Sequence, residues 1–292
     1  MEPCPICQKE VTFRKLYERF DFEFKNKYHI LECPLCRIRR TLPIPQDLSF
    51  LYQHSEYSKP QQGLYHALKG VLLRHEIRRI HSITKSKEFL DMGSGHGDFA
   101  ENCFRLGYSV VAADGSPRRP YYIQSIDQVP YAHFDFKKNQ IDLPEHVKAR
   151  VVVLRHVLEH IEDPLMFLQK FIDNKADFFY IAVPNFDRFE RILFRQYDLL
   201  LGLPYHLWHF NKTSLKNLLG GLGLEIMKIG YDTIPTVWHN IDLFLRTKKY
   251  PKFLISFIEF PPIKTPLWLT LNILSPNNVI WVVAKTPQHR SK

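Results

Sequence analysis

The chain has 292 residues, of which 45% are hydrophobic and 24% charged, enough for an enzyme domain of about 200 residues and a smaller module. No apolar run approaches the roughly 20 residues that cross a bilayer, and the start at Met1 lacks a secretory signal, so we expect a soluble, cytoplasmic protein. The net charge of +10 is uneven, because residues 1–85 carry 15 Lys and Arg against 9 Asp and Glu. This basic part suits an anionic partner, although an excess of this size is also common on a solvated surface.

Four of the five cysteines form two Cys-Pro-x-Cys pairs within the first 36 residues, and the segment between the pairs reads as short strands. Each turn of this kind directs two thiolates to one point, and two turns supply the four-sulfur tetrahedron that Zn²⁺ prefers. In a reducing compartment this spacing favours a metal over disulfides. Residues 1–42 are therefore predicted to form a zinc-ribbon-like module with one structural Zn²⁺, bound by Cys4, Cys7, Cys33 and Cys36.

Residues 43–85 read as a connector followed by a helix. Prolines interrupt the first part, and apolar residues at helical spacing occupy the second, from 65 to 83. This helix is expected to pack against one face of a sheet.

The segment 88–97 reads Glu-Phe-Leu-Asp-Met-Gly-Ser-Gly-His-Gly, which predicts a strand, a glycine turn and the start of a helix. Gly93, Gly95 and Gly97 allow a tight turn and the close approach of a ligand to the backbone. A second strand ends at Asp114, which lies 19 residues past Gly95 and can accept hydrogen bonds from both ribose hydroxyls of a nucleotide cofactor.

The details of this turn favour S-adenosylmethionine over a dinucleotide. A dinucleotide fingerprint would place its third glycine at position 98, where this chain has Asp98. Asp91 supplies a carboxylate that suits an amino-acid ammonium and would repel a pyrophosphate. Downstream, strands and helices alternate, which indicates an α/β fold with a mainly parallel sheet and helices on both faces.

Downstream motifs extend this pattern. Residues 151–164 read Val-Val-Val-Leu-Arg-His-Val-Leu-Glu-His-Ile-Glu-Asp-Pro, and residues 204–210 read Pro-Tyr-His-Leu-Trp-His-Phe. With the glycine turn, these segments resemble class I S-adenosylmethionine-dependent methyltransferases, in particular the subgroup of ubiquinone-biosynthesis O-methyltransferases and sugar or polyketide methyltransferases. The resemblance covers roughly residues 86–235. It implies a Rossmann-like, seven-stranded methyltransferase domain over 86–292, with the cofactor also contacted by Asp135 and Phe136.

Three polar residues follow the predicted fourth strand: His156, Glu159 and His160. Their spacing predicts one helical turn with all three on one face. The resembling ubiquinone enzymes have Glu-x-x-Glu-His here, a proposed divalent-metal site, and His156 replaces the first Glu. His156 can instead be the base that takes a proton from an acceptor hydroxyl, while Glu159 and His160 either bind Mg²⁺ or another divalent ion or only cap local backbone.

The subgroup also carries a histidine at the position of His206, which makes His206 the second candidate base, and His209 is an additional loop histidine. Further on, residues 250–276 are rich in Phe, Ile, Leu and Trp but too short and too broken by proline to span a bilayer. This insertion can cover the substrate pocket, form a subunit contact, pack on the core or lie on a membrane surface, with nearby lysines facing lipid phosphates.

The sequence thus predicts a methyltransferase for a small-molecule, glycan or lipid-linked acceptor, with transfer to oxygen in line with the sulfonium leaving group. An RNA methyltransferase that uses the basic zinc module is the main alternative. Against it, Leu154-Arg-His-Val differs from the Asn-Pro-Pro-Tyr type, and the module lacks a series of stacking aromatics. A non-catalytic scaffold that binds the cofactor is a third reading. The acceptor and the oligomeric state do not follow from the sequence.

Overall fold

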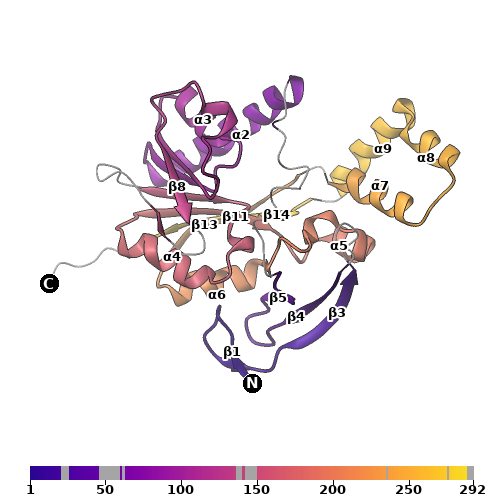
Figure 1. Ribbon diagram of the computed structural model, residues 1–292, viewed down its shortest axis with the longest axis horizontal. Coiled ribbons are helices and arrows are strands. Elements are labelled where there is room, and N and C mark those ends of the chain that lie inside the picture. The colour runs from indigo at the N-terminus through magenta and orange to yellow at the C-terminus, as the bar shows by residue number, and fades with distance from the viewer. Residues whose placement is uncertain are drawn as a thin grey trace.

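The computed structural model describes residues 1–20, 26–45, 60, 63–135, 140–141, 150–234, 236–274 and 276–287. At its centre is a sheet in the order β13-β14-β11-β10-β6-β7-β8-β9 (Figure 1). The resemblance implied seven strands, and the eighth strand of this sheet, β9, has only two residues. Their bounds are β6 Glu88–Met92, β7 Ser109–Asp114, β8 Tyr131–Asp135, β9 Gln140–Ile141, β10 Val151–Arg155, β11 Phe178–Pro184, β13 Glu225–Asp232 and β14 Val279–Lys285.

Strands β8, β7, β6, β10 and β11 pair in parallel, whereas β14 is antiparallel to both β11 and β13. Strand β13 therefore runs in the same direction as the parallel set. All six of these strands end at one edge of the sheet, which we call the carboxyl edge. Ligands of open α/β sheets bind outside this edge.

Helices cover both faces of the sheet because its strands carry apolar side chains on both faces. Helices α2 (Leu64–Thr84) and α3 (Asp98–Arg105) lie on one face, and α4 (Pro164–Asp173) and α6 (Lys212–Gly221) lie on the other (Figure 1). The buried residues form one apolar cluster on each face. The fold class predicted from the sequence is confirmed.

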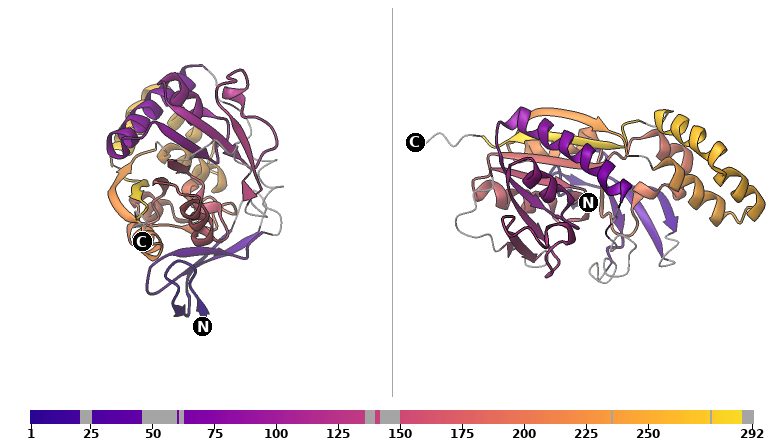
Figure 2. Two further views of the ribbon diagram at one scale, coloured as in Figure 1. Left: turned by 90° about the vertical axis from the view of Figure 1, so that its left-hand side faces the viewer. Right: turned by 90° about the horizontal axis from the view of Figure 1, so that it is seen from above.

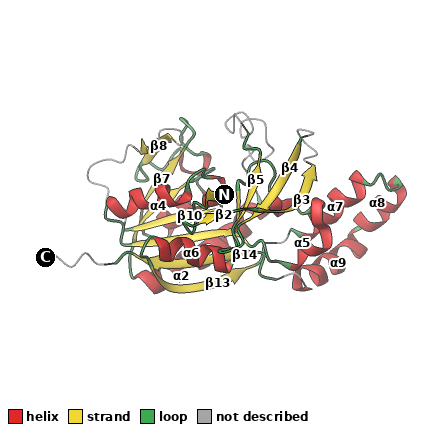
Figure 3. Ribbon diagram, turned by 90° about the horizontal axis from the view of Figure 1, so that it is seen from below, coloured by secondary structure: helices red, strands yellow, loops and turns green. Residues whose placement is uncertain are grey.

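The N-terminal segment forms β1 (Glu2–Pro3), β2 (Glu10–Val11), β3 (Arg14–Phe20), β4 (Lys27–Glu32) and β5 (Arg39–Leu42). A second sheet has the order β12-β5-β4-β3, where β12 is the two-residue strand Trp208–His209. Strand β12 comes from the loop before α6, so the module is joined to the methyltransferase-like part by backbone hydrogen bonds as well as by packing. In Figure 3 these strands stand beside the central sheet.

Between β13 and β14 the chain forms α7 (Val237–Thr247), α8 (Lys252–Glu259) and α9 (Pro261–Leu274), which we call the helical lobe. The lobe projects away from the sheet in the right-hand view of Figure 2. Because β13 ends at the carboxyl edge, the lobe leaves the core on the side where ligands bind. None of the described helices combines the length and apolar character needed to cross a membrane.

Candidate functional site

The chain leaves β6 through a turn whose glycines all have positive φ: +73° at Gly93, +53° at Gly95 and +86° at Gly97. A Cβ at Gly93 would lie 2.4 Å from Cγ2 of Val157, so a side chain does not fit. At Gly97 an added Cβ would lie 3.0 Å from Cβ of Pro120. Nothing lies within 4 Å of a Cβ built at Gly95, which leaves this backbone open to a ligand.

Asp91 lies one residue before the end of β6 and is 3% exposed. Burial raises the pKa of its carboxyl to about 7, against the opposing charge of Arg155 and with a contribution from the Asp114 and Asp98 charges. Its Oδ2 has no hydrogen-bond partner among the described residues. A buried carboxyl that ionises with difficulty is stabilised by a nearby cation, such as an ammonium group.

Asp114 ends β7 and faces the glycine turn. Its Oδ2 accepts a hydrogen bond from the backbone N–H of Gly95 at 2.8 Å, and its Oδ1 accepts one from the N–H of Ser116 at 3.1 Å. These bonds orient the carboxylate and leave further lone pairs for a ligand. Asp135 ends β8 at the same edge, but its side chain, like the whole of Phe136, lies outside the described residues.

Behind the turn lies a polar network that the sequence analysis missed. The Nε of Arg155 is 3.1 Å from both carboxylate oxygens of Glu76 on α2, and the Tyr180 hydroxyl donates to Glu76 Oε1 at 2.7 Å. Burial lowers the pKa of Arg155, but Glu76 and Tyr180 outweigh it and raise the value overall. An arginine ending the otherwise apolar β10 was the available signal, because such a side chain needs a buried partner.

The segment after β10 does not form the predicted α-helical turn. His156 has a φ of +55°, and only Leu158–His160 is helical, as the 3₁₀-helix η3. The His156 N–H donates to the carbonyl oxygen of Ala182 at 2.8 Å, which holds the residue at the end of the sheet. Its Nδ1 lies 3.5 Å from Oε1 of Glu159, so the two side chains are neighbours although the predicted helix is absent.

Glu159 is 1% exposed, and neither of its carboxylate oxygens has a hydrogen-bond partner among the described residues. Nε2 of His206 lies 4.0 Å from the same Oε1 that faces His156. The structure thus brings His156 and His206, the two candidate bases, to one buried carboxylate. A buried carboxylate without partners requires a cation or a donor to complete it.

The tautomers of His160 and His206 follow from their partners. Nδ1 of His160 is 2.9 Å from the carbonyl oxygen of Tyr205, and Nδ1 of His206 is 3.2 Å from that of Leu200. Carbonyl oxygens only accept, so these contacts place a hydrogen on Nδ1 of each ring, and the backbone of His156 is a further hydrogen-bond partner of the His160 ring. Burial lowers the pKa of His160 and, further, that of His206, which keeps both rings neutral. Glu159, His160 and His206 offer ligand atoms within 4.8 Å of one another, a spacing that a metal ion can bridge.

His209 has a structural position. It is 5% exposed, its Nε2 lies 2.8 Å from the Thr41 hydroxyl, and burial lowers its pKa to about 3.

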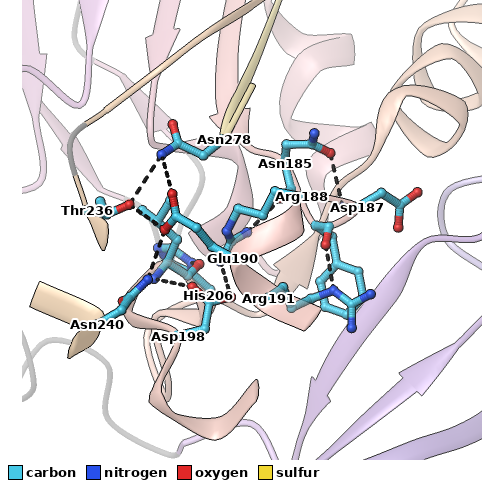
Figure 4. Close-up of polar contacts among 12 residues, drawn as sticks. Asn185, Asp187, Arg188, Glu190, Arg191, Asp198, His206, Thr236, Asn240 and Asn278 are labelled. Atoms are coloured by element: carbon cyan, nitrogen blue, oxygen red, sulfur yellow. Dashed lines mark hydrogen bonds and ion pairs between the residues drawn. The ribbon is translucent and has the colours of Figure 1, made fainter. Parts of the chain in front are cut away.

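A second buried network fixes the base of the helical lobe (Figure 4). Oε2 of Glu190 accepts hydrogen bonds from Thr236, directly before the lobe, and from Asn240 on α7, each at 2.9 Å.

The four cysteines of the N-terminal module converge as predicted. The Sγ atoms of Cys4 and Cys36 are 3.7 Å apart, those of Cys7 and Cys33 are 3.9 Å apart, and all four lie within 4.8 Å of one another. Zn–S bonds of about 2.3 Å in a regular tetrahedron place sulfurs about 3.8 Å apart, so the geometry fits Zn²⁺.

The strand order, the antiparallel β14 and the glycine turn at the carboxyl edge define the class I S-adenosylmethionine-dependent methyltransferases. A family model described as a methyltransferase domain matches residues 65–229, more than half of the chain, and the chain therefore belongs to this family. It is an S-adenosylmethionine-dependent methyltransferase.

One curated relative is the mitochondrial ubiquinone biosynthesis O-methyltransferase of Schizosaccharomyces pombe, 33% identical over 99 residues. That match covers 32% of this chain and only 35% of the relative. A solved structure from Bacillus halodurans, assigned as a methyltransferase, aligns with a TM-score of 0.50 and 16% identity over 74% of this chain and 99% of its own. A SAM-dependent methyltransferase from Archaeoglobus fulgidus aligns with a TM-score of 0.49 and 19% identity, covering 82% and 100%.

Proposed function

We propose that the enzyme methylates a hydroxyl group of a small-molecule, glycan or lipid-linked acceptor, with His156 as the base. The observation that carries this proposal is the distance of 3.5 Å between Nδ1 of His156 and Oε1 of Glu159, a buried carboxylate with no hydrogen-bond partner among the described residues. When His156 takes the proton of the hydroxyl, the neighbouring carboxylate stabilises the imidazolium. The similarity to an O-methyltransferase supports transfer to oxygen.

His206 is the second candidate base, because it faces the same carboxylate oxygen of Glu159. Burial lowers the pKa of His206 well below its usual value, which weakens His206 as a base. A divalent ion such as Mg²⁺ is a further candidate at this place, held by Glu159, His160 and His206. Two neutral imidazoles and a carboxylate without a hydrogen-bond partner among the described residues fit such an ion. A bound ion polarises the acceptor hydroxyl. In that case His206 is a ligand, and His156 alone remains as the base.

The cofactor is proposed to lie over the turn at the carboxyl edge. Gly93, Gly95 and Gly97 form its floor, Asp91 faces the ammonium group of S-adenosylmethionine, and Asp114 accepts from the ribose hydroxyls. Asp135 and Phe136 are proposed to hold the adenine.

Zn²⁺ is proposed as a structural ion in the four-cysteine cluster. The two cysteine turns have the same backbone geometry, with a left-handed residue directly after the second cysteine of each, at Gln8 and Arg37. Cys4, Cys33 and Cys36 are buried within the core cluster that α6 also enters, so the ion would stabilise the contact between the module and the enzyme domain. Thiolates of this kind persist in a reducing compartment, which supports a cytoplasmic location.

The helical lobe is proposed to rest on an anionic membrane surface. Phe253, Phe257 and Phe260 are exposed by 76%, 61% and 56%, and Phe253 and Phe257 share one face of α8. Lys248, Lys249 and Lys252 are also exposed beside them. Apolar side chains that enter the lipid boundary next to basic ones suit anionic headgroups. The lobe leaves the carboxyl edge, so a docked enzyme could receive a lipid-linked acceptor.

The base is tested by single-turnover methyl transfer across pH, with hydroxylated small molecules as acceptors. His156→Ala, and to a smaller extent His206→Ala, should lower the rate by about 10²-fold while the affinity for S-adenosylhomocysteine stays nearly unchanged. His75→Ala, an exposed change on α2, is the matched control. Near-normal rates in both variants would mean that positioning alone carries the reaction. Loss of activity on dialysis against EDTA, restored by Mg²⁺, would favour the divalent ion.

Membrane docking is tested by cosedimentation with phosphatidylglycerol and phosphatidylcholine vesicles. Binding is expected to phosphatidylglycerol, and the double change Phe253→Ser with Phe257→Ser should abolish it. Leu72→Ser is the control, because Leu72 on α2 is 71% exposed and lies outside the lobe. Equal binding by the double variant and the control would contradict the proposal, and a change in oligomeric state would assign the lobe to a subunit contact.

A further inference from the structure

A depression of about 450 Å³ lies between the N-terminal module and the segment that follows β11. From β3 it is lined by Tyr17 and Arg19, which are two residues apart and therefore share one face of the strand. The other side is formed by α5 (Phe189–Phe194) and the 3₁₀-helix η4 (Arg195–Tyr197). The lining residues are Tyr17, Arg19, Arg191, Ile192 and Arg195.

The depression holds three arginines and, among the described residues that line it, no carboxylate. In the described part of the chain, Arg19, Arg191 and Arg195 form no ion pair. Asp198 is the carboxylate that acts on Arg19, and it is already engaged in a buried ion pair with Arg188. Burial lowers the pKa of Arg19, and the charges of Arg191 and Arg195 lower it further. Like charges are thus held together, which an anion would relieve.

Neighbouring groups hold two of these guanidinium groups in place. The guanidinium carbon of Arg19 lies 3.9 Å from the centre of the Tyr17 ring, and that of Arg191 lies 4.3 Å from the centre of the Phe186 ring. The Nε of Arg191 also donates to the Phe186 carbonyl oxygen at 2.7 Å (Figure 4). Stacked guanidinium groups lose little entropy when they bind a ligand.

The buried Nε of Arg19 has no hydrogen-bond partner among the described residues, and the Tyr17 hydroxyl lies beside Arg191, itself a cation of the depression. Buried polar atoms are nearly always hydrogen-bonded in native proteins, so an unpaired donor beside three cations indicates a ligand. Guanidinium groups bind phosphate oxygens through paired hydrogen bonds. A carboxylate would offset less of the charge than a phosphate or diphosphate.

The depression is connected to the proposed catalytic histidines. Arg195 begins η4, and the next short helix, η5 (Leu199–Leu201), contains Leu200, whose carbonyl oxygen faces Nδ1 of His206 at 3.2 Å. We propose that this depression binds the phosphate or diphosphate group of the methyl acceptor. The assignment to the acceptor rests on the proposed function, whereas anion binding by the pocket does not.

Isothermal titration of the full chain with inorganic diphosphate tests the pocket. The wild-type protein should bind it, and Arg195→Gln and Arg19→Gln should each weaken binding about tenfold or more. Arg78→Gln removes the same charge from an exposed position on α2 and should leave binding unchanged. All four proteins should retain their affinity for S-adenosylhomocysteine, which reports the cofactor site separately. Because Arg195 is exposed, its variant remains informative if Arg19→Gln fails to fold.

Absence of diphosphate binding, or an equal effect of Arg195→Gln and Arg78→Gln, would overturn the pocket. Arg195→Gln should also be tested for binding to a 20-nucleotide oligouridylate and to phosphatidylglycerol vesicles. If the variant loses more affinity for either of these than for diphosphate, the arginines bind RNA or lipid, and the proposal is overturned. Hydroxylated acceptors with and without a phosphate test the assignment to the acceptor. The phosphorylated member should have the higher kcat/KM, and Arg195→Gln should remove that preference. If diphosphate binds but the phosphorylated acceptor is not preferred, the pocket stands as an anion site and only its assignment to the acceptor is overturned.

Discussion

Replacing Asp91 with asparagine tests whether this buried carboxyl has a raised pKa and binds the ammonium group of the cofactor. Burial raises its pKa from 3.8 to about 7, so between these values the unfolded chain releases a proton that the folded chain keeps. The residue therefore destabilises the cofactor-free fold increasingly as the pH rises, up to about pH 7. At 1.36 kcal/mol for each pKa unit, the cost is ~4 kcal/mol at pH 8 and ~1.5 kcal/mol at pH 5. Asparagine avoids this cost at both pH values.

The free energy of unfolding, measured in urea at pH 5 and pH 8, should rise on Asp91→Asn by ~2.5 kcal/mol more at the higher pH than at the lower. Packing differences between the two side chains cancel in this comparison. Titration calorimetry should show S-adenosylmethionine bound about 10²-fold more weakly, because a charge-assisted contact is lost. Asp127→Asn, at an exposed position, should change neither quantity. A stability difference independent of pH would refute the raised pKa, and unchanged cofactor affinity would refute the contact with the ammonium group.

Two further predictions concern the sites that the sequence suggests most clearly. Asp114→Ala should weaken binding of S-adenosylhomocysteine by about tenfold or more, because the variant loses the acceptor that also orients Gly95, and equal affinity in calorimetry would remove Asp114 from the site. Asp127→Ala is its control. Cys33→Ser should lose the zinc of the N-terminal module, as elemental analysis of the purified protein would show, and a protein that keeps one zinc per chain would rule out the four-cysteine site.

The sequence alone predicted the glycine turn and the strand that precedes it. The turn needs positive φ at Gly93, Gly95 and Gly97, a backbone conformation that favours glycine, so this local demand is visible in the residue type. The convergence of the four cysteines was predictable for a similar reason, because each Cys-Pro-x-Cys turn directs its two sulfur atoms to one point. The strands of the sheet followed from hydrophobic runs, whose period does not depend on distant contacts.

Other features depended on contacts between distant parts of the chain. The i, i+3, i+4 spacing after β10 predicted a helix, but His156 takes a left-handed conformation because its N–H pairs with Ala182 of the adjacent strand. Only the tertiary structure brings His206, some 50 residues away, to the carboxylate of Glu159. The lobe over 237–274 was seen from the sequence only as an apolar insertion, without its helices.

The arginine-lined depression shows the same division most clearly. Arg19 belongs to a strand of the N-terminal module, and Arg191 and Arg195 belong to helices more than 170 residues later, so no local pattern connects them. The sequence revealed a basic excess but not its arrangement, because net charge carries no information on distance. Motifs whose geometry is enforced by the covalent chain could be predicted, whereas clusters assembled by the pairing of β5 with β12 and by the packing of α5 required the folded molecule.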